Sequence, residues 1–392
     1  MSGVESDSGG VAARWSVGVS SVIQERVRVA HTSRAPVRIT GKSNWLRAGR
    51  PVTATNGITV ADYDGVVDYV PGDLTITLRA GTTLSELARI TGEQGQWFPI
   101  NPFGADNGTI GATVATGSSG PLAHGFGSIR DLVLGIEAVT GEAKVIRGGG
   151  RVVKNVAGFD LVRLFIGSWG TLGVITELSL RLYASPQHRM TMTIDAPIDP
   201  RRLAEHLRAL LEAPIIPFAV ELISSELARR IGLPPRELIL LEIGGNAAAV
   251  AAQRDALGKL AQASEAPADS WQKLRTIEGE AGMVFRLSGL PTGLAARWAQ
   301  IARIAAGCDG AMLHASVGRG TVRCIFPDAS SIELIELLST PDPNDTVIFE
   351  TLPPNLWEKL SPSATADRVS QGLRAAFDPL GLLNPGILGP LN

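Results

Sequence analysis

A stretch of small residues, GTIGATVATGSSGP at residues 108 to 121, is the first feature that could do chemistry. It has four glycines, three threonines and two serines, and it has no charge and no side chain larger than isoleucine. Small residues let backbone N–H groups approach a ligand closely, and hydroxyls add donors without a formal charge. Such a loop suits a pyrophosphate or the polar edge of a flavin. Turns and tight strand packing use the same residues, so this stretch alone leaves both interpretations open.

Two further small-residue stretches favour ligand binding. The segment VRITGKSNWLRAGRP (37 to 51) places Gly41, Lys42, Ser43 and Asn44 directly after a predicted strand. The segment GSWGTLGVITEL (167 to 178) has glycines in a GxxGxxG spacing before another predicted strand. A dinucleotide fingerprint would have GxGxxG followed by a helix, so these stretches predict a different kind of cofactor loop.

Several isolated residues have a structural and a functional interpretation. We expect His314 to be a strand residue that finds a hydrogen bond rather than a catalytic group. We expect Arg130 and Asp131 to form an ion pair at a corner rather than to contact a cofactor. Lys154, or Arg151, could stabilise the negative charge of a reduced flavin, or it could be a solvated cation.

The two cysteines exclude several site types. Cys308 and Cys324 form no CxxC pair and lie near no histidine cluster. This chain alone therefore predicts no disulfide framework, no zinc site, no other metal site and no iron–sulfur cluster. Both thiols are expected to be small buried side chains.

Composition places the chain among ordinary globular proteins of more than one domain. It has 392 residues, of which 44% are hydrophobic and 19% charged, with 36 basic against 38 acidic side chains. No long run of one charge marks a nucleic-acid or anionic-membrane surface. We expect no transmembrane segment and no secretory signal, and hence a cytoplasmic protein, with any contact to the inner membrane face made through partners.

The first half predicts an α+β domain over residues 1–186 that is rich in strands and poor in long helices. Strand pairs are expected within 65–81 and within 128–148, and a buried strand within 170–186. The segment TTLSELARITGEQG (82 to 95) predicts a helix with a threonine N-cap. These elements would carry the small-residue stretches.

Residues 187–365 predict a second α+β domain. Two copies of a strand, helix, strand, strand, helix pattern indicate a duplicated ferredoxin-like unit with one antiparallel sheet and helices on one face. The last segment, 366–392, predicts a helix followed by a Pro/Gly-rich tail that must return to the first domain.

The order of these segments resembles the FAD-binding domain of the vanillyl-alcohol oxidase, or PCMH-type, superfamily. The similarity rests on VRITGKSN, DLTITLRAGTTLSEL, GTIGATVATGSSGP, IRDLVLGIEAV, KNVAGFDLVRLFIGSWGTLGVITEL and the tail DPLGLLNPG. Within that superfamily the chain resembles the FAD-binding subunits of glycolate oxidase. The resemblance implies a two-subdomain FAD-binding fold with a ferredoxin-like second domain.

The resemblance also assigns site residues. It implies that Gly41 to Asn44 form the pyrophosphate loop and that the backbone of Ile175 meets the nucleotide end, and Gly173 is a further expected cofactor-binding residue. The residues expected to line the flavin are Thr109, Gly111, Gly117 and Ser118. Some relatives tether the flavin through a histidine in the first loop, and residues 40 to 47 contain none, which implies noncovalent FAD.

Two departures from related D-2-hydroxyacid dehydrogenases leave the function open. Their HxGDGNxH and EHGxG segments are absent, and Trp169 stands where relatives often have Glu. Trp169 is expected to pack under the flavin loop rather than to contact substrate. The leading hypothesis is a flavoprotein subunit that oxidises glycolate or another D-2-hydroxy acid and works with a paralogous flavoprotein and an iron–sulfur subunit. One alternative is a flavin-bearing or flavin-free scaffold without its own substrate site. The other is an independent FAD-linked oxidase or a UDP-sugar reductase on the same fold.

Overall fold

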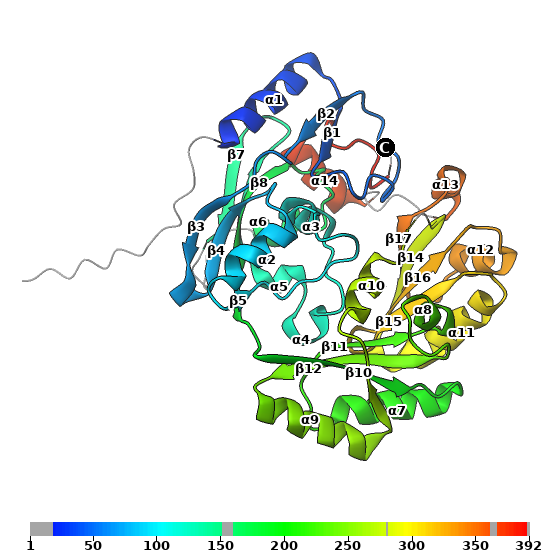
Figure 1. Cartoon of the computed structure of the whole chain (residues 1–392). Helices are drawn as coiled ribbons and strands as arrows, with labels where there is room; N and C mark the ends of the chain where they lie inside the picture. The colour runs from blue at the N-terminus through cyan, green and yellow to red at the C-terminus, as the bar shows by residue number, and fades with distance from the viewer. Residues whose placement is uncertain (1–18, 151–159, 280, 361–366, 390–392) are drawn as a thin grey trace, which may run out of the picture.

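The computed structural model describes residues 19–150, 160–279, 281–360 and 367–389. The described chain forms a first α+β domain, a second domain built on a large sheet, and a C-terminal segment that packs on the first domain (Figure 1). The α+β fold class predicted from sequence is confirmed. The expected limits at residues 186 and 365 stay a prediction.

A five-stranded antiparallel sheet is the core of the first domain. Its strand order is β3-β4-β8-β6-β7, and β3 pairs with β4 and β6 with β7 as the sequence predicts. The strands are β3 (Val66–Val70), β4 (Thr75–Arg79), β6 (Val133–Val139), β7 (Val145–Gly149) and β8 (Val174–Arg181).

Helices cover both faces of this sheet. On one face, apolar side chains of four short helices pack with the strands: α2 (Leu84–Gly92), α3 (Ile110–Thr116), α5 (Ile129–Leu132) and α6 (Leu161–Phe165). The other face is covered by α1 (Val19–Ser33), whose Ile23 and Val27 pack against Val139 and Val174. The sequence predicts few long helices in this half, and α1, with 15 residues, is the one long helix in its described part; burial of its apolar face against this distant sheet stabilises it.

Two small sheets complete the first domain. One is the parallel pair β1 (Val37–Thr40) and β2 (Asn56–Thr59), and the other is the antiparallel pair β5 (Gln96–Trp97) and β9 (Tyr183–Ala184). The helix α4 (Ala123–Phe126) extends from this domain and packs on the second one.

The second domain is built on an eight-stranded antiparallel sheet with the order β13-β10-β12-β11-β15-β16-β14-β17. Numbered within each half, the strands follow the order 4-1-3-2 of a ferredoxin-like unit, and the two halves join where β11 pairs with β15. The duplication predicted from sequence is therefore present. The strands are β10 (His188–Asp195), β11 (Pro217–Ile223), β12 (Leu238–Gly245), β13 (Ala263–Glu265), β14 (Met283–Ser288), β15 (Met312–Ser316), β16 (Thr321–Phe326) and β17 (Thr346–Thr351).

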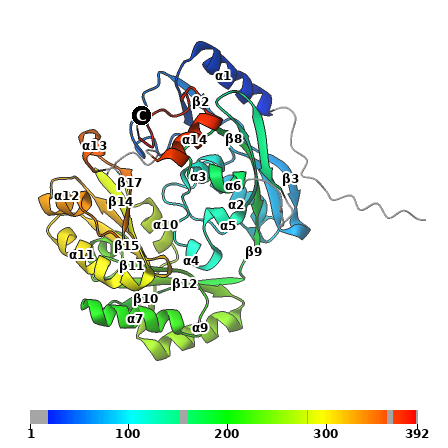
Figure 2. The same ribbon diagram turned by 180° about the vertical axis from the view of Figure 1, so that it is seen from behind.

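Helices lie on both faces of this sheet, which corrects the one-face prediction. The side away from the first domain is covered by the long helices α7 and α9 (Figure 2) and by α11 and α12. The opposite side is partly covered by α8 and α10, whose Leu227 and Trp271 belong to a separate apolar cluster. The bounds are α7 (Pro200–Glu212), α8 (Ser225–Arg230), α9 (Ala247–Leu260), α10 (Ser270–Thr276), α11 (Leu294–Ala306), α12 (Ile332–Ser339) and α13 (Trp357–Leu360).

The C-terminal segment packs on the first domain. Phe377, the last residue of α14 (Arg368–Phe377), contacts Phe165, and its carbonyl accepts a hydrogen bond from the Gly141 N–H. Beyond α14 the chain runs beside β1, where the Val37 N–H donates to the Leu382 carbonyl (Figure 1).

Candidate cofactor site

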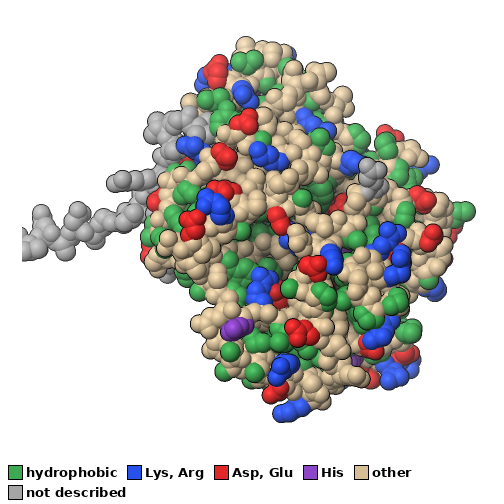
Figure 3. All heavy atoms as spheres, in the orientation of Figure 1, with side chains coloured by type: hydrophobic (Ala, Val, Ile, Leu, Met, Phe, Trp, Pro, Cys, Tyr) green, Lys and Arg blue, Asp and Glu red, His purple; other side chains and the backbone are tan. Residues whose placement is uncertain are grey.

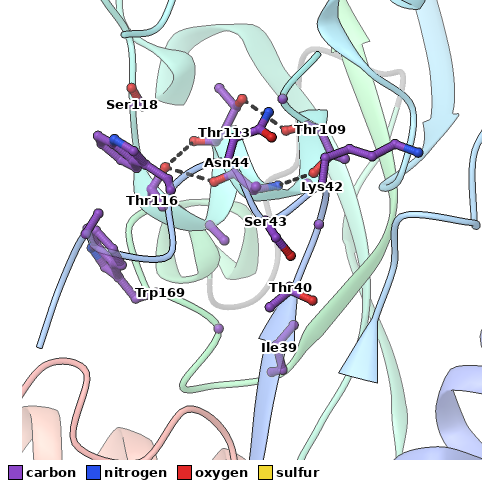
Figure 4. Close-up of a pocket in the computed structure, with 18 of the residues that line it drawn as sticks. Ile39, Thr40, Lys42, Ser43, Asn44, Thr109, Thr113, Thr116, Ser118 and Trp169 are labelled. Atoms are coloured by element: carbon purple, nitrogen blue, oxygen red, sulfur yellow. Dashed lines mark hydrogen bonds between the residues drawn. The ribbon is translucent and has the colours of Figure 1, made fainter. Parts of the chain in front are cut away.

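A large pocket lies in the first domain, between β1, α3 and the turn before β8 (Figure 4). Its empty space is ≈ 1310 Å³, including the part open to solvent, which is ample for a cofactor-sized ligand. The lining consists of residues 38–46, Ala48, Val60, Leu84, 102–105, Gly108, Thr109, 111–113, Ala115, Thr116, Ser118, Trp169, Gly170, Gly173, Ile175, Asn384 and Ile387.

The charge of the pocket is positive. Arg38 and Lys42 are the only ionisable side chains among the described lining residues, and both are basic. The Arg38 guanidinium donates to the Leu46 carbonyl at 2.6 Å, which holds the loop after β1. Without acidic neighbours in this lining, an anionic ligand meets attraction and no like-charge repulsion.

The loop after β1 reaches the start of α3. A Cβ on Gly41 would lie 2.3 Å from the Thr109 hydroxyl oxygen, so only glycine fits at this approach. Ser43 has a φ of 62°, and the Asn44 amide donates to the Asn107 side-chain oxygen at 2.7 Å. The loop therefore presents its backbone and small polar side chains to the pocket.

The stretch expected to be a bare loop contains the helix α3. The Thr109 hydroxyl caps it by accepting from the Ala112 N–H at 3.3 Å. The hydroxyls of Thr113 and Thr116 donate to carbonyls one turn earlier (Figure 4). The loop prediction is wrong here because small residues also let a helix pack closely, and Gly111 would bring a Cβ within 2.8 Å of the Ala80 carbonyl oxygen.

The third stretch forms a strained turn. Trp169 has a φ of 53° between the left-handed Gly167 and Gly170. Its indole, labelled in Figure 4, stacks on that of Trp45, with 6.0 Å between ring centroids and 12° between planes, and both residues line the pocket. Trp169 thus packs within the wall.

The structure brings nine of the ten predicted site residues to this one pocket. Gly117 is the exception, because it ends α3 in a left-handed conformation (φ 66°) and is outside the lining. Sequence reasoning missed Arg38, Trp45, the 102–105 segment and Asn384. Asn384 could have been found from the LLNPG tail, which contains it. Arg38 could have been found because it is a basic residue within the short apolar run APVRITG at 35 to 41.

The segment 102–106 forms the wall between the pocket and the second domain. Arg275 of α10 donates to the Pro102 carbonyl at 2.8 Å and pairs with Asp106 at 2.5 Å. The ring of Phe103 lies 5.0 Å from that of His314 and 4.3 Å from the guanidinium carbon of Arg323, measured to ring centroids. This wall separates the described pocket lining from the ionisable groups of the large sheet.

Those ionisable groups form buried pairs. His314 Nδ1 lies 2.7 Å from the Glu221 carboxylate, which confirms the expected hydrogen bond. Arg323, only 2% exposed, donates to Glu350 and Glu278. Burial opposes ionisation of Glu350, but the charges of Arg323 and Arg286 and the hydrogen bond from Arg323 together outweigh it and lower the pKa of that carboxyl.

The sequence also predicted an Arg130–Asp131 ion pair and a cation at Lys154 or Arg151. Asp131 closes a capping box with Ser128, accepting from its N–H and hydroxyl at 2.8 Å, rather than forming the expected pair with Arg130. Lys154 and Arg151 lie outside the described residues.

Comparison with known proteins identifies the domain. The FAD binding domain family matches residues 19–149. The structure of 4-ethylphenol oxidase from Gulosibacter chungangensis superposes with a TM-score of 0.71 over 95% of this chain and 88% of that one, at 16% identity, which shows the fold. The first domain has the PCMH-type FAD-binding fold. Its cofactor is FAD, and the basic, glycine-rich lining fits a dinucleotide that carries a pyrophosphate.

Two curated relatives are named for glycolate oxidation. Glycolate oxidase subunit GlcE of Escherichia coli is 39% identical over 175 residues, which are 44% of this chain and 49% of that protein. Glycolate oxidase subunit GlcD of Bacillus subtilis is 30% identical over 237 residues, 57% of this chain and 49% of that protein. The matched regions thus span about half the length of these relatives.

Proposed function

We propose that this chain is the FAD-binding subunit of a glycolate oxidase-like complex that oxidises glycolate or another D-2-hydroxy acid. The likeness to GlcE and the FAD pocket support this proposal. The two cysteines of the chain are too few for an iron–sulfur cluster, so a cluster that takes the electrons would be on a partner. A paralogous flavoprotein subunit is the second proposed partner.

The pocket residues have distinct proposed roles. Gly41 to Asn44 would hold the pyrophosphate, with Arg38 and Lys42 supplying positive charge, and Gly173 and Ile175 would meet the nucleotide end. Thr109, Gly111 and Ser118 would line the flavin. Gly117 would not contact the flavin, but it would end α3 and so set the position of Ser118. Bound FAD supplies a two-electron acceptor that can release electrons singly. Noncovalent binding is proposed because residues 40 to 47 contain no histidine.

One observation favours a second candidate function, a flavin-bearing companion without its own substrate site. Among the described lining residues there is no carboxylate and no histidine, and none comes from residues 187–365. The 102–106 wall stands between this lining and the His314–Glu221 pair. In that case the flavin would be reduced by the paralogous subunit rather than by substrate.

Stopped-flow reduction separates the two candidates. The isolated chain, loaded with FAD under anaerobic conditions, is mixed with millimolar glycolate, D-lactate or L-lactate as the control acid. Rapid bleaching by a D-2-hydroxy acid or glycolate would identify a catalytic subunit. Bleaching only within the three-subunit complex would identify the companion, and a flavin that stays oxidised in the active complex would contradict both.

Cofactor identity has a direct test. The purified protein should be yellow, and acid should release intact FAD into the supernatant. FMN in that supernatant, or flavin retained in the precipitate, would contradict noncovalent FAD.

The location proposed for this subunit is the cytoplasm, with any membrane contact made through partners. Within the described ranges, no helix combines the length and apolar composition needed for a membrane span. Fractionation of cells that do and do not express the partner subunits would test the proposal, and a membrane-bound chain without partners would contradict it.

A further inference from the structure

The C-terminal tail contributes directly to the FAD pocket. Residues 382–384 run parallel to β1, with Val37 bridging to Leu383 and the Asn384 N–H donating to the Val37 carbonyl at 3.0 Å. Asn384 and Ile387 both line the pocket. A segment more than 340 positions away in sequence therefore lies beside the strand that leads into the proposed pyrophosphate loop.

The Asn384 side chain joins two walls of that pocket. Its oxygen accepts from the Ile39 N–H at 2.7 Å, and its amide nitrogen donates to the Trp169 carbonyl at 2.7 Å. Ile39 belongs to β1, and Trp169 belongs to the strained turn before β8. One side chain thus holds the end of β1 and the Trp169 turn at a set separation.

The position itself is specialised for asparagine. Asn384 is 4% exposed and has a φ of 45°, a left-handed conformation that asparagine tolerates better than most residues. An ionised aspartate at this position would offer only acceptors, and an alanine would offer neither an acceptor nor a donor. A buried residue with this conformation and two bridging bonds is costly to replace, which points to a role in shaping the pocket.

We propose that Asn384 is a positioning residue for FAD: it fixes the Trp169 turn relative to β1, so that the two walls are in place before the cofactor binds. This inference rests on the FAD site proposed above. Preorganisation raises affinity because the walls lose no further freedom when the ligand arrives. Asn384 itself need not touch FAD for this effect.

The test compares three substitutions by titration of apo-protein with FAD and by the rate of FAD dissociation. Asn384→Ala removes both bonds and strains the left-handed backbone, whereas Asn384→Gly removes both bonds but accepts that backbone. Asn384→Asp keeps the acceptor and loses the donor to Trp169. We expect FAD affinity to fall on the order of tenfold in all three variants, through faster dissociation.

Asn246→Ala is the matched control. Asn246 caps α9 of the second domain, its side chain accepting from the Ala249 N–H at 2.8 Å, and it is remote from the pocket lining. Its loss should lower the stability of the second domain without changing FAD affinity. If Asn384→Gly folds and binds FAD within twofold of the wild type, the proposal is wrong. Wild-type protein that binds no FAD would contradict the FAD site itself, which is a separate outcome.

Discussion

Gly111 shows how closely the FAD domain packs its helix α3 against the sheet. A Cβ at this position would lie 2.7 Å from the Ala80 Cβ and 2.8 Å from the Ala80 carbonyl oxygen. The Gly111 N–H donates to the same carbonyl at 2.9 Å. The lack of a side chain at Gly111 therefore lets α3 pack closely against the turn that follows β4, and the pocket surface depends on that contact.

Gly111→Ala should destabilise the first domain by about 1–3 kcal/mol, because backbone atoms must move to admit the methyl group. FAD affinity should fall as well, since α3 carries part of the lining. Urea unfolding and FAD titration measure the two effects. Gly92→Ala is the control, because nothing lies within 4 Å of a Cβ there; equal losses in both variants would contradict the packing argument.

At the scale of elements, α10 of the second domain holds one wall of the pocket. Arg275 on this helix is 8% exposed, and its guanidinium binds the carbonyl of Pro102 and the carboxylate of Asp106. The Gly104 N–H in turn donates to the Arg275 carbonyl at 2.9 Å. The position of this wall thus depends on the docking of the two domains.

Arg275→Met should lower stability by about 1.5–3 kcal/mol, the range for hydrogen bonds to a charged group, and should speed FAD dissociation. Arg229→Met on α8 is the control, because Arg229 is exposed and solvent screens its pair with Glu226, which therefore contributes little to stability. Thermal unfolding with and without FAD separates the two effects. An unchanged dissociation rate would show that the wall does not contribute to retention.

At the scale of the whole molecule, α4 links the two domains. The ring of Phe126 packs on Phe218 of β11, with 4.9 Å between centroids. His124 on the same helix has a buried Nδ1 with no hydrogen-bond partner among the described residues, and a Cβ on Gly318 would lie 2.8 Å from that atom. Burial lowers the pKa of His124 below its usual 6.5, although the charge of Glu221 opposes the shift.

Stability should therefore fall as the pH decreases from about 7.5 to 5.5. Unfolded His124 takes up a proton near pH 6.5, whereas the folded residue does so only at lower pH, so the unfolded state binds more protons in this window. His124→Gln should reduce the slope of the unfolding free energy against pH. Exposed His188→Gln is the control. Some pH dependence should remain in His124→Gln, because burial also lowers the pKa of His206. A slope equal to that of the wild type would show that His124 does not contribute to the pH dependence of stability.

The sequence by itself determined the features that depend on neighbouring residues. The hairpins of the first domain, the Thr83 cap of α2 and the two ferredoxin-like halves follow from alternation, capping and turn residues within short windows. The three small-residue stretches also indicated the cofactor pocket, because close backbone approach is a local property of glycine.

Only the tertiary structure decided the features that depend on distant partners. Helix α3 packs through Gly111 against Ala80, and the charge of Glu350 is stabilised by Arg323 on another strand. Asn384 meets Ile39 across 345 positions of sequence. Such contacts leave no periodic signal in the chain, since the free energy that stabilises them comes from burial and hydrogen bonding between segments that approach only in the folded protein.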